Sequence, residues 1–293
     1  MEWKNYHIEA LLDRALQEDI ATGDLTTRLT VDPALQATAT ILARQNLTVC
    51  GLGCISAFLD RFAALHPSEA TRFEVVSHPE IFDSVDVRDG QPLAVIRHRA
   101  QALLSCERVI LNLLQHLSGI ATLTRRYADA LRGTSARVLD TRKTIPGLRM
   151  LEKYAVVCGG GTNHRLDLSD GVLIKNNHIA LGGGIRRVLA QSLAARPAGK
   201  RIQIEVRSME ELAEALEAGA EAILLDNMTP DQTAACVKRI RRGDGWIPIE
   251  ASGGIVLENI RAYAEAGVDF ISVGALTHSA PAADISMRIA AVN

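Results

Sequence analysis

Four basic residues lie within the stretch LDTRKTIPGLRMLEKYAV, at Arg142, Lys143, Arg149 and Lys153. The chain as a whole is nearly neutral, because 32 basic residues face 34 acidic ones and the formal net charge is −2. Such a chain lacks the extended basic face that nucleic acids and anionic membrane surfaces require. The cluster therefore predicts a binding site for a small anion.

More chemistry-bearing residues follow short apolar runs that are expected to be β-strands. The runs 136–141, 171–178, 201–206, 220–227, 247–254 and 269–275 deliver, in order, Arg142 and Lys143; Lys175, Asn176 and His178; Glu205 and Arg207; Asp226 and Asn227; Glu250, Ser252, Gly253 and Gly254; and Gly274. His164 and Arg165 lie shortly before the second run. Carboxyl ends of parallel strands meet at one edge of a sheet, so we expect these residues to share one site.

The residue types narrow the ligand. Ser252-Gly253-Gly254 is expected to close a strand and open a helix, where backbone N–H groups can hold a phosphate, and Gly274 allows a similarly close approach. Glu205 and Asp226 can share a magnesium ion, or can instead pair with Lys143 or Lys175.

Four cations then remain at the predicted site: Arg142, His164, Arg165 and Lys175. Lys175 follows the apolar run GVLI, where a lone lysine is uncommon unless it is paired. The arginine fork matches carboxylates in a bidentate way. These residues predict a substrate with more than one carboxylate.

Alternating strands and helices from residue 136 onward must position this site. Helices are predicted at 184–195, 208–218, 230–242 and 256–266, and the alternation indicates a barrel or a doubly wound sheet. Residues 20–100 have short alternating stretches typical of a separate α+β domain, preceded by an amphipathic helix near 8–20. A long helical pattern from 101 to 133 joins the two parts, with a break expected near Ser118 and Gly119.

The five cysteines are scattered and odd in number, which favours a reducing compartment over a disulfide framework. Cys50 and Cys54 form a C-x3-C pair, but no second pair completes a zinc set at a usual spacing, so we expect structural burial. We expect neither a targeting segment nor a membrane span, since the start reads as a surface helix and no run of about 18 apolar residues occurs. The predicted location is the cytoplasm.

Several strings carry a resemblance to a known family: EDIATGDLTT, ERVILNLLQHLSGIAT, DTRKTIPGLRMLEKYAVVCGGGTNHRLDLSDGVLIKNNH, ILLDN, EASGGI and ISVGALTHSAP. In these strings, which span nearly the whole chain in the family's order, the sequence resembles the quinolinate phosphoribosyltransferases, the carboxylating nicotinate-nucleotide pyrophosphorylases of NAD synthesis. The resemblance implies transfer of phosphoribosyl from 5-phosphoribosyl 1-pyrophosphate to quinolinate with decarboxylation, giving nicotinate mononucleotide, pyrophosphate and CO2.

The resemblance also implies an architecture. It predicts an N-terminal α/β sandwich domain over residues 1–110, with residues 277–293 packing against it, and an incomplete, roughly seven-stranded α/β barrel over 111–276. The protein is expected to be a homodimer whose sites are completed by the neighbour's N-terminal domain, with Arg108 reaching into the partner's site.

Roles are implied residue by residue. Quinolinate would be bound by Arg108, Arg142, His164, Arg165 and Lys175; phosphoribosyl pyrophosphate by Lys143, Glu205, Asp226, Ser252, Gly253, Gly254 and Gly274; Mg²⁺ by Glu205 and Asp226; and the catalytic group would be Lys143, Lys175, Glu205 and Asp226. His278 matches a family motif and is expected to be structural. The sequence departs from the family at Asn176, where Asp is frequent, and at Arg207, where an acidic residue is common.

Three other functions remain open from the sequence. One is a phosphoribosyltransferase-like paralogue linked to molybdate transport, against which His164, Arg165 and the string SGIAT favour quinolinate. Another is a Schiff-base aldolase using Lys175 or Lys143, which borohydride trapping would reveal. The third is a noncatalytic anion-binding protein, which would release neither pyrophosphate nor CO2.

Overall fold

The computed structural model describes residues 1–67, 72–243 and 245–292, which form two compact units. The N-terminal unit contains residues 1–123 and 157–160 and the chain from residue 280 onward, and the C-terminal unit contains residues 124–156 and 161–279. The sequence placed the change of domain near residue 110. Among the helices that the structure describes, none has the length and apolar character needed to cross a membrane.

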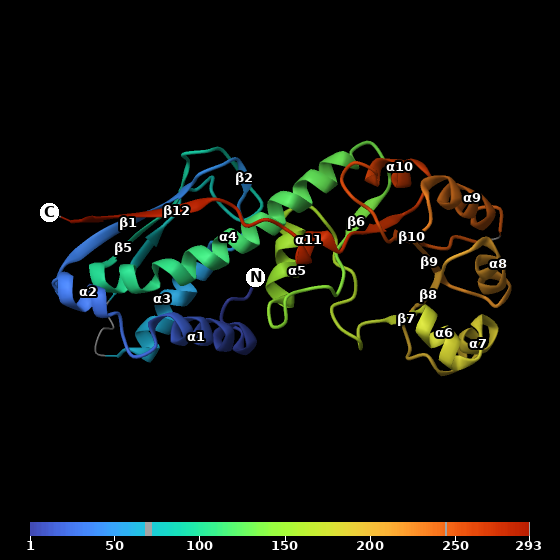
Figure 1. The fold of residues 1–293 in the computed structure, drawn as a ribbon, viewed down its shortest axis with the longest axis horizontal. Coiled ribbons are helices and arrows are strands. Elements are labelled where there is room, and N and C mark those ends of the chain that lie inside the picture. Colours follow the sequence, from blue (N-terminus) through green and yellow to red (C-terminus); the bar gives the residue numbers. More distant parts are fainter. Residues whose placement is uncertain (68–71, 244, 293) are drawn as a thin grey trace. The chain divides into compact units, whose positions relative to one another are not determined.

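The N-terminal unit is built on an antiparallel sheet with the order β12-β1-β5-β3. Its strands are β1 (Gln36–Ala43), β3 (Glu74–Val76), β5 (Pro92–Arg99) and β12 (Ile285–Ala291). Alternate residues of β1 are buried, among them Ala37, Ala39 and Ile41, which is the period expected of a strand with one face on a core. Helices α1 (Tyr6–Ile20), α2 (Leu25–Thr30) and α3 (Gly53–Leu65) and a small pair, β2 (Leu47–Thr48) with β4 (Asp86–Val87), complete the unit (Figure 1).

Helix α4 (Ala100–Ala130) is continuous, so the break predicted near Ser118 and Gly119 is wrong. A glycine inside a helix lowers helix propensity by about 1 kcal/mol without ending the helix. Here Gly119 serves a close approach, because a Cβ at this position would lie 2.1 Å from the carbonyl oxygen of Pro281. The glycine signal was therefore a packing requirement and not a helix end.

The C-terminal unit contains a parallel sheet with the order β6-β11-β10-β9-β8-β7. The strands are β6 (Arg137–Leu139), β7 (Val172–Ile174), β8 (Ile202–Val206), β9 (Ala222–Asp226), β10 (Ile249–Ser252) and β11 (Phe270–Ser272). All six predicted runs thus contain a strand, and a single bridge from Leu139 to Thr162 extends the edge. In the described part of the chain, the two edge strands β6 and β7 do not pair with each other, so the sheet does not close into a complete barrel. This confirms the predicted α/β fold with an incomplete barrel.

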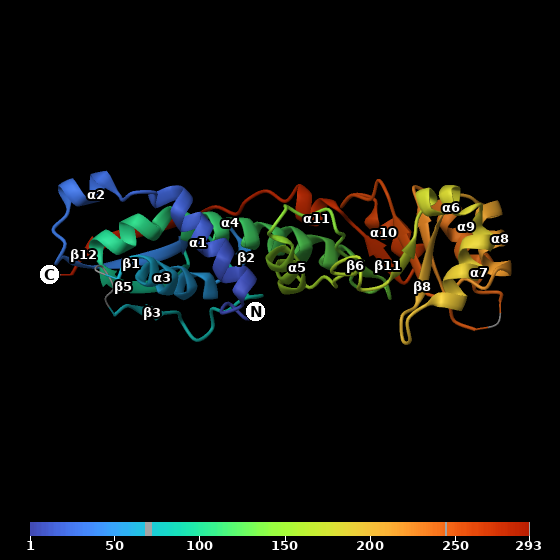
Figure 2. The same ribbon diagram turned by 90° about the horizontal axis from the view of Figure 1, so that it is seen from below.

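Helices cover the outer side of these strands, as Figures 1 and 2 show for α7 (Ile185–Ala195), α8 (Met209–Glu217) and α9 (Pro230–Ile240). Ser208 caps α8 by accepting a hydrogen bond from the Glu211 amide, and Thr229 with Gln232 forms a capping box on α9. Further helices are α5 (Arg149–Cys158), α6 (Asn176–Gly182), α10 (Ile260–Glu265) and α11 (Ala275–His278).

Two element boundaries differ from the predictions. The run 171–178 does not continue as a strand, because α6 begins at Asn176 and Lys175 is its extended N-terminal flanking residue. The His178 ring stabilises this start by accepting a hydrogen bond from the Lys175 amide at 2.9 Å. Helix α10 begins at Ile260 and not at 256, because Gly253 and Gly254 both have positive φ and are followed by turns.

Candidate functional site

A cavity of about 290 Å³ lies at the carboxyl ends of the parallel strands. Its lining residues are Thr141, Arg142, Lys143, His164, Arg165, Leu173, Lys175, Glu205, Leu224, Asp226, Glu250, Ser252 and Ser272. Eight of the predicted site residues are therefore brought together: Arg142, Lys143, His164, Arg165, Lys175, Glu205, Asp226 and Ser252. Six of them lie at or just beyond the carboxyl ends of strands, which meet because parallel strands all point the same way, whereas His164 and Arg165 follow the bridge at Thr162.

The remaining predicted residues do not line this cavity. Gly253 has φ +94, and a Cβ there would lie 2.3 Å from the Asn227 side-chain oxygen. Gly254 has φ +64, and a Cβ there would have no heavy atom within 4 Å. A Cβ on Gly274 would lie 3.1 Å from the Lys143 side chain. Arg108 lies exposed on α4, in the N-terminal unit.

The predicted phosphate site needs a correction at Ser252-Gly253-Gly254. These residues do close β10, but no helix opens directly after them, since α10 starts six residues beyond Gly254. Without a helix terminus at this point, the residues can offer only turn amides to a phosphate. The positive φ of both glycines and the open space around Gly254 leave the backbone accessible there.

Cationic groups form one wall of the cavity. The pKa of Arg165 is lowered, mainly because the guanidinium is partly buried and also because Arg142 carries a like charge nearby. Arg165 Nη1 donates to the Gly171 carbonyl at 3.3 Å. The Arg142 Nε is buried and has no hydrogen-bond partner among the described residues. Buried donors are normally paired, so these arginines have unmet capacity for an anion.

The same cavity also holds the carboxylates of Glu205 and Asp226. Glu205 is 8% exposed, and its pKa is raised first by burial and then by the negative charge of Asp226. Within the described part of the chain, neither carboxylate forms a direct ion pair with Lys143 or Lys175, which was the alternative prediction, although the charge of Lys175 lies close enough to Glu205 to oppose the rise in its pKa. Two neighbouring carboxylates that repel each other fit a hard divalent cation such as Mg²⁺.

Two residues of the opening cluster do not belong to the site. Lys153 is 2% exposed and forms a buried ion pair with Asp140, and its Nζ also donates to the His164 carbonyl at 3.0 Å. Arg149 donates to the Thr144 hydroxyl at 3.0 Å. Only Arg142 and Lys143 of the four basic residues line the cavity. Helical spacing explains this, because Arg149 and Lys153 lie on α5 and not at a strand end.

Glu250 and Ser272 line the cavity without having been assigned a role from the sequence. Glu250 lies two residues before Ser252, and Ser272 lies two residues before Gly274. Because strand side chains alternate with a period of two, residues at this spacing point to the same side of the sheet. Gln203 and Glu205 on β8, and Glu250 and Ser252 on β10, show the same spacing. Counting back two positions from Gly274 would have identified Ser272, whereas Glu250 was already among the residues expected at the site.

A second cavity of about 400 Å³ lies at the amino ends of the strands, with Arg201, Trp246 and Pro248 in its lining. It shares His164, Arg165, Leu173 and Glu250 with the first cavity. These four residues thus separate two openings of the same barrel.

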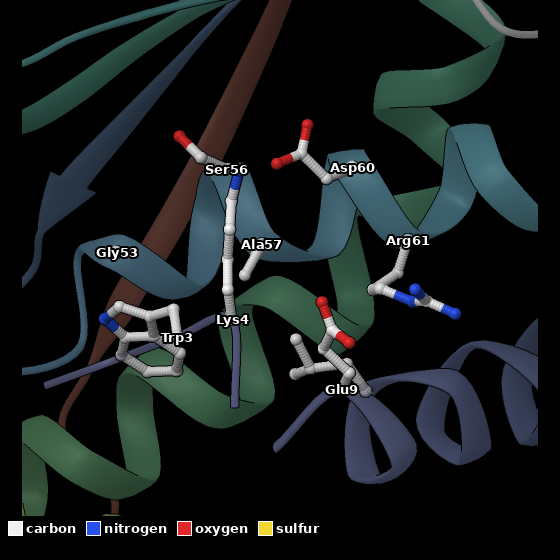
Figure 3. A pocket seen from close by; sticks show the side chains of 9 residues that line it. Trp3, Lys4, Glu9, Gly53, Ser56, Ala57, Asp60 and Arg61 are labelled. Carbon is white, nitrogen blue, oxygen red and sulfur yellow. The ribbon is translucent and has the colours of Figure 1, made fainter. Parts of the chain in front are cut away.

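The N-terminal unit has its own features outside this site. Figure 3 shows a cavity of about 100 Å³ in which Lys4 extends across the helix that carries Ser56 and Asp60. Cys50 and Cys54 are both buried, as predicted, but the ligating atoms that lie within 4.8 Å of one another belong to Cys50, Asp83 and Cys158. None of these residues was predicted to belong to the functional site.

Comparisons with known proteins cover nearly the whole chain. A family model described as the quinolinate phosphoribosyl transferase N-terminal domain matches residues 24–118, and the model of the C-terminal domain matches residues 120–288. The nicotinate-nucleotide pyrophosphorylase [carboxylating] of Mycobacterium leprae is 42% identical over 277 residues, which cover 94% of this chain and 95% of that protein.

Further relatives agree with these matches. A quinolinate phosphoribosyltransferase [decarboxylating] of Nicotiana tabacum is 35% identical over 300 residues, covering 97% of this chain and 83% of that protein. The crystal structure of NadC from Streptococcus pyogenes superposes with a TM-score of 0.91 at 36% identity and covers all of both chains.

Proposed function

The chain belongs to the quinolinate phosphoribosyl transferase family, and from this premise we propose how its strand-end cavity carries out the family's reaction. The protein is a decarboxylating phosphoribosyltransferase of NAD synthesis. It transfers phosphoribosyl from 5-phosphoribosyl 1-pyrophosphate to quinolinate and releases nicotinate mononucleotide, pyrophosphate and CO2.

We assign the quinolinate carboxylates to the cationic wall. Arg142, Arg165 and Lys175 line the same cavity, and the two arginines have few or no partners of their own. A dicarboxylate would satisfy the unpaired Arg142 Nε and offset the repulsion between Arg142 and Arg165. We assign His164 to the same quinolinate-binding group because it directly precedes Arg165 in the chain and also lines the cavity.

We assign phosphoribosyl pyrophosphate to the opposite side, with Lys143, Glu205, Asp226, Ser252, Gly253, Gly254 and Gly274. Glu205 and Asp226 would hold Mg²⁺, which supplies positive charge to a leaving pyrophosphate. Lys143 would bind pyrophosphate oxygens, since its side chain lies beside Gly274, where the absence of a Cβ leaves room. The backbone amides at Gly253 and Gly254 would hold the 5-phosphate.

The chain's own residues act by placement and by charge. Holding the ring nitrogen of quinolinate against the anomeric carbon of the ribose converts a bimolecular encounter into a unimolecular one. Fixed cations at Arg142, Arg165 and Lys175 keep two highly anionic substrates together. After the bond forms, the ring nitrogen is positively charged and stabilises the carbanion that loss of the 2-carboxylate as CO2 leaves on C2. This carbanion then takes a proton from water, so a protein nucleophile is not required.

The coexistence of a cationic wall and a carboxylate pair in one cavity carries this proposal. It also argues against a Schiff-base aldolase, because a lysine that forms an imine is usually activated by an apolar pocket, whereas Lys175 is exposed beside Glu205. The relatives compared above carry phosphoribosyltransferase or pyrophosphorylase names. They give no support to the paralogue linked to molybdate transport.

Two further features belong to the proposal. We place the protein in the cytoplasm, for which the five buried free cysteines are support. We also propose a homodimer in which Arg108 acts in the partner's site. Arg108 is exposed on α4 and is not among the residues that line the cavity of its own chain, which supports a role toward another protomer.

One assay tests the function. Purified protein is incubated with quinolinate, phosphoribosyl pyrophosphate and Mg²⁺, and the products are separated by chromatography. We expect nicotinate mononucleotide, pyrophosphate and CO2 in equal amounts, and no product when either substrate or the metal is omitted. Product formation without added metal in the presence of a chelator would contradict the role of Glu205 and Asp226.

A further inference from the structure

Glu250 is a buried carboxylate in the cavity wall to which the reaction above gives no task. It is 3% exposed, on β10, and lines both cavities of the barrel. Its Oε2 accepts a hydrogen bond from Gln203 Nε2 at 2.7 Å and lies 3.4 Å from His164 Nε2. The Ser272 hydroxyl donates to Oε1. Three donors from three segments of the chain thus converge on one side chain.

These contacts keep Glu250 ionised in spite of its burial. Burial by itself opposes the charge, but the hydrogen bonds from His164, Ser272 and Gln203 outweigh it and lower the pKa of Glu250. A buried carboxylate with no other use is costly to a fold, and an apolar group of equal size is often as stable or more so. Its position beside the site therefore calls for a functional explanation.

The His164 ring is held at both nitrogens. Nδ1 accepts a hydrogen bond from the backbone amide of Arg165 at 2.7 Å, so this nitrogen carries no hydrogen. The hydrogen is then on Nε2, which faces the Glu250 carboxylate at 3.4 Å. In this arrangement the ring has no nitrogen left for a substrate oxygen. Its connection to the site runs through the Arg165 backbone.

The backbone of His164 is fixed by a second buried carboxylate. The His164 amide donates to Asp140 Oδ1 at 2.8 Å, and its carbonyl accepts a hydrogen bond from Lys153 Nζ at 3.0 Å. Asp140 and Lys153 therefore set the path of the chain, which leaves the rotation of the imidazole to be set by Glu250. Arg165 follows directly in the chain, so its position depends both on the backbone contacts of His164 and on the orientation of the His164 ring.

We propose that Glu250 is a positioning residue for quinolinate binding, which holds the His164 ring against the Arg165 amide and so places the Arg165 guanidinium for a substrate carboxylate. This inference rests on the assignment of quinolinate to the cationic wall. It gives His164 an indirect role in which it transmits the orientation set by β10. Glu250 itself touches neither the substrate nor the reacting atoms.

The test compares Glu250→Ala, Glu250→Gln, His164→Ala and the double variant Glu250→Ala with His164→Ala. The KM values for quinolinate and for phosphoribosyl pyrophosphate are measured separately, and quinolinate binding is measured by calorimetry without the second substrate. We expect Glu250→Ala to raise the quinolinate KM and Kd about tenfold or more, which is the size expected for losing a charged hydrogen-bonded partner. The KM for phosphoribosyl pyrophosphate should stay within about twofold of the wild type.

The conservative variant separates position from charge. In Glu250→Gln the amide oxygen can still accept from His164 and Gln203, while the amide N–H₂ can donate to the Ser272 hydroxyl. We expect this variant to recover most of the quinolinate affinity that Glu250→Ala loses. If the alanine variant fails to fold, Glu250→Leu, which removes the acceptor but keeps most of the side-chain volume, replaces it in both the single and the double variant.

The double variant tests whether Glu250 acts through His164. If it does, removing Glu250 after His164 is already gone should change the quinolinate Kd by less than about twofold. Two effects that multiply in the double variant would overturn the proposal. So would a folded Glu250→Ala protein that binds quinolinate as the wild type does.

Asp269→Asn is the matched control for a general loss of stability. Asp269 is another partly buried carboxylate of this barrel, pairs with Arg241 and accepts from the Ile249 amide, but it does not line the cavity. We expect it to lower the unfolding temperature and leave the quinolinate KM within about twofold. Failure of the proposed function would show differently, as a wild-type protein that forms no nicotinate mononucleotide.

Discussion

Arg142 and Arg165 are like charges that face one cavity in the absence of substrate. The pKa of Arg165 is lowered by partial burial and by the charge of Arg142, and the Arg142 Nε has no partner in the described chain. Both conditions are unfavourable in the free protein and are relieved when an anion enters. Binding energy for a dicarboxylate is therefore built into the resting site.

Replacing Arg142 with alanine should weaken quinolinate binding by roughly 30-fold to 1000-fold, which corresponds to the loss of about 2 to 4 kcal/mol from a buried charge-assisted contact. Calorimetry with quinolinate alone gives the Kd. Arg149→Ala is the control, because this cation comes from the same stretch of sequence but does not line the cavity. An unchanged Kd in Arg142→Ala would show that the assignment is wrong.

Glu205 links the site to the stability of the fold. Its pKa is raised by burial and by Asp226, so the folded protein holds the Glu205 proton to a higher pH than the unfolded chain does. The free energy of unfolding therefore falls as the pH rises from the ordinary pKa of glutamate through the raised value. At neutral pH the wild type bears the whole cost of this charge.

Glu205→Gln should accordingly raise the unfolding temperature near pH 7 while it abolishes metal-dependent turnover. The gain should disappear near pH 4, where the carboxylate is protonated in both states. Calorimetric melting curves at several pH values, without added metal, give the comparison. Glu265→Gln, at an exposed pair with Arg261, should change little at either pH. A glutamine variant that is less stable than the wild type at pH 7 would contradict the prediction.

Among the elements, α4 depends on one small residue. It continues unbroken through Gly119, and the chain at Pro281 approaches the helix closely at that position. Close contact between a helix and another backbone requires the absence of a side chain at the crossing. The segment from Pro281 then leads into β12, which pairs with β1.

Gly119→Ala should lower the free energy of unfolding by roughly 1 to 3 kcal/mol, since overpacking outweighs the gain in helix propensity. Urea unfolding followed by circular dichroism measures the change. Gly243→Ala is the matched control, because its added Cβ would make only an ordinary contact at 3.5 Å. Equal stability of the two variants would show that the Pro281 segment moves aside without cost.

Strands were predictable from the sequence because their apolar runs are buried on both faces. Each of the six runs contains an observed strand, and the N-cap residues Ser208 and Thr229 mark the starts of α8 and α9. Boundaries that depend on tertiary contacts were not predictable. The start of α6 depends on His178 accepting from the Lys175 amide, and the need for a glycine at position 119 within α4 depends on the close approach of Pro281.

Site residues at strand ends were predictable for the same geometric reason, and six of them line one cavity together with His164 and Arg165. Lys153 was counted with the basic cluster of residues 142–153 because sequence distance does not show that it points into the core toward Asp140. Glu250 was visible as a strand residue, but its partners Gln203, Ser272 and His164 come from elsewhere in the chain. Only the fold brings them within reach.

At the scale of the whole molecule, a nearly neutral chain concentrates cations where the substrates meet. The net charge is −2, yet the cavity holds Arg142, Lys143, Arg165 and Lys175 together. A local field of this kind attracts small anions without drawing the protein to nucleic acids. Arg108 lies outside this cluster, which makes its predicted use in trans testable.

Mixing two inactive variants should restore activity if Arg108 acts in the partner's site. Arg108→Ala and Lys175→Ala are each expected to be inactive, and a heterodimer of the two has one site with both residues intact. Random exchange of equal amounts should therefore recover about a quarter of the wild-type activity. The assay follows nicotinate mononucleotide after subunit exchange. No recovery in verified heterodimers would place Arg108 in the site of its own chain or outside catalysis.

The four residues shared by the two cavities have a consequence for the solvent inside the barrel. The barrel is divided across its axis by four side chains, those of His164, Arg165, Leu173 and Glu250. The proposed substrate site lies on one side of them, and the cavity at the amino ends of the strands lies on the other. Replacing Leu173 or Glu250 with a smaller residue would join the two cavities into one channel that is open at both ends of the barrel. Water admitted from below would raise the local dielectric and weaken every charge contact that the reaction uses. The contact between His164 and Glu250 thus also separates the proposed substrate site from the cavity at the amino ends of the strands.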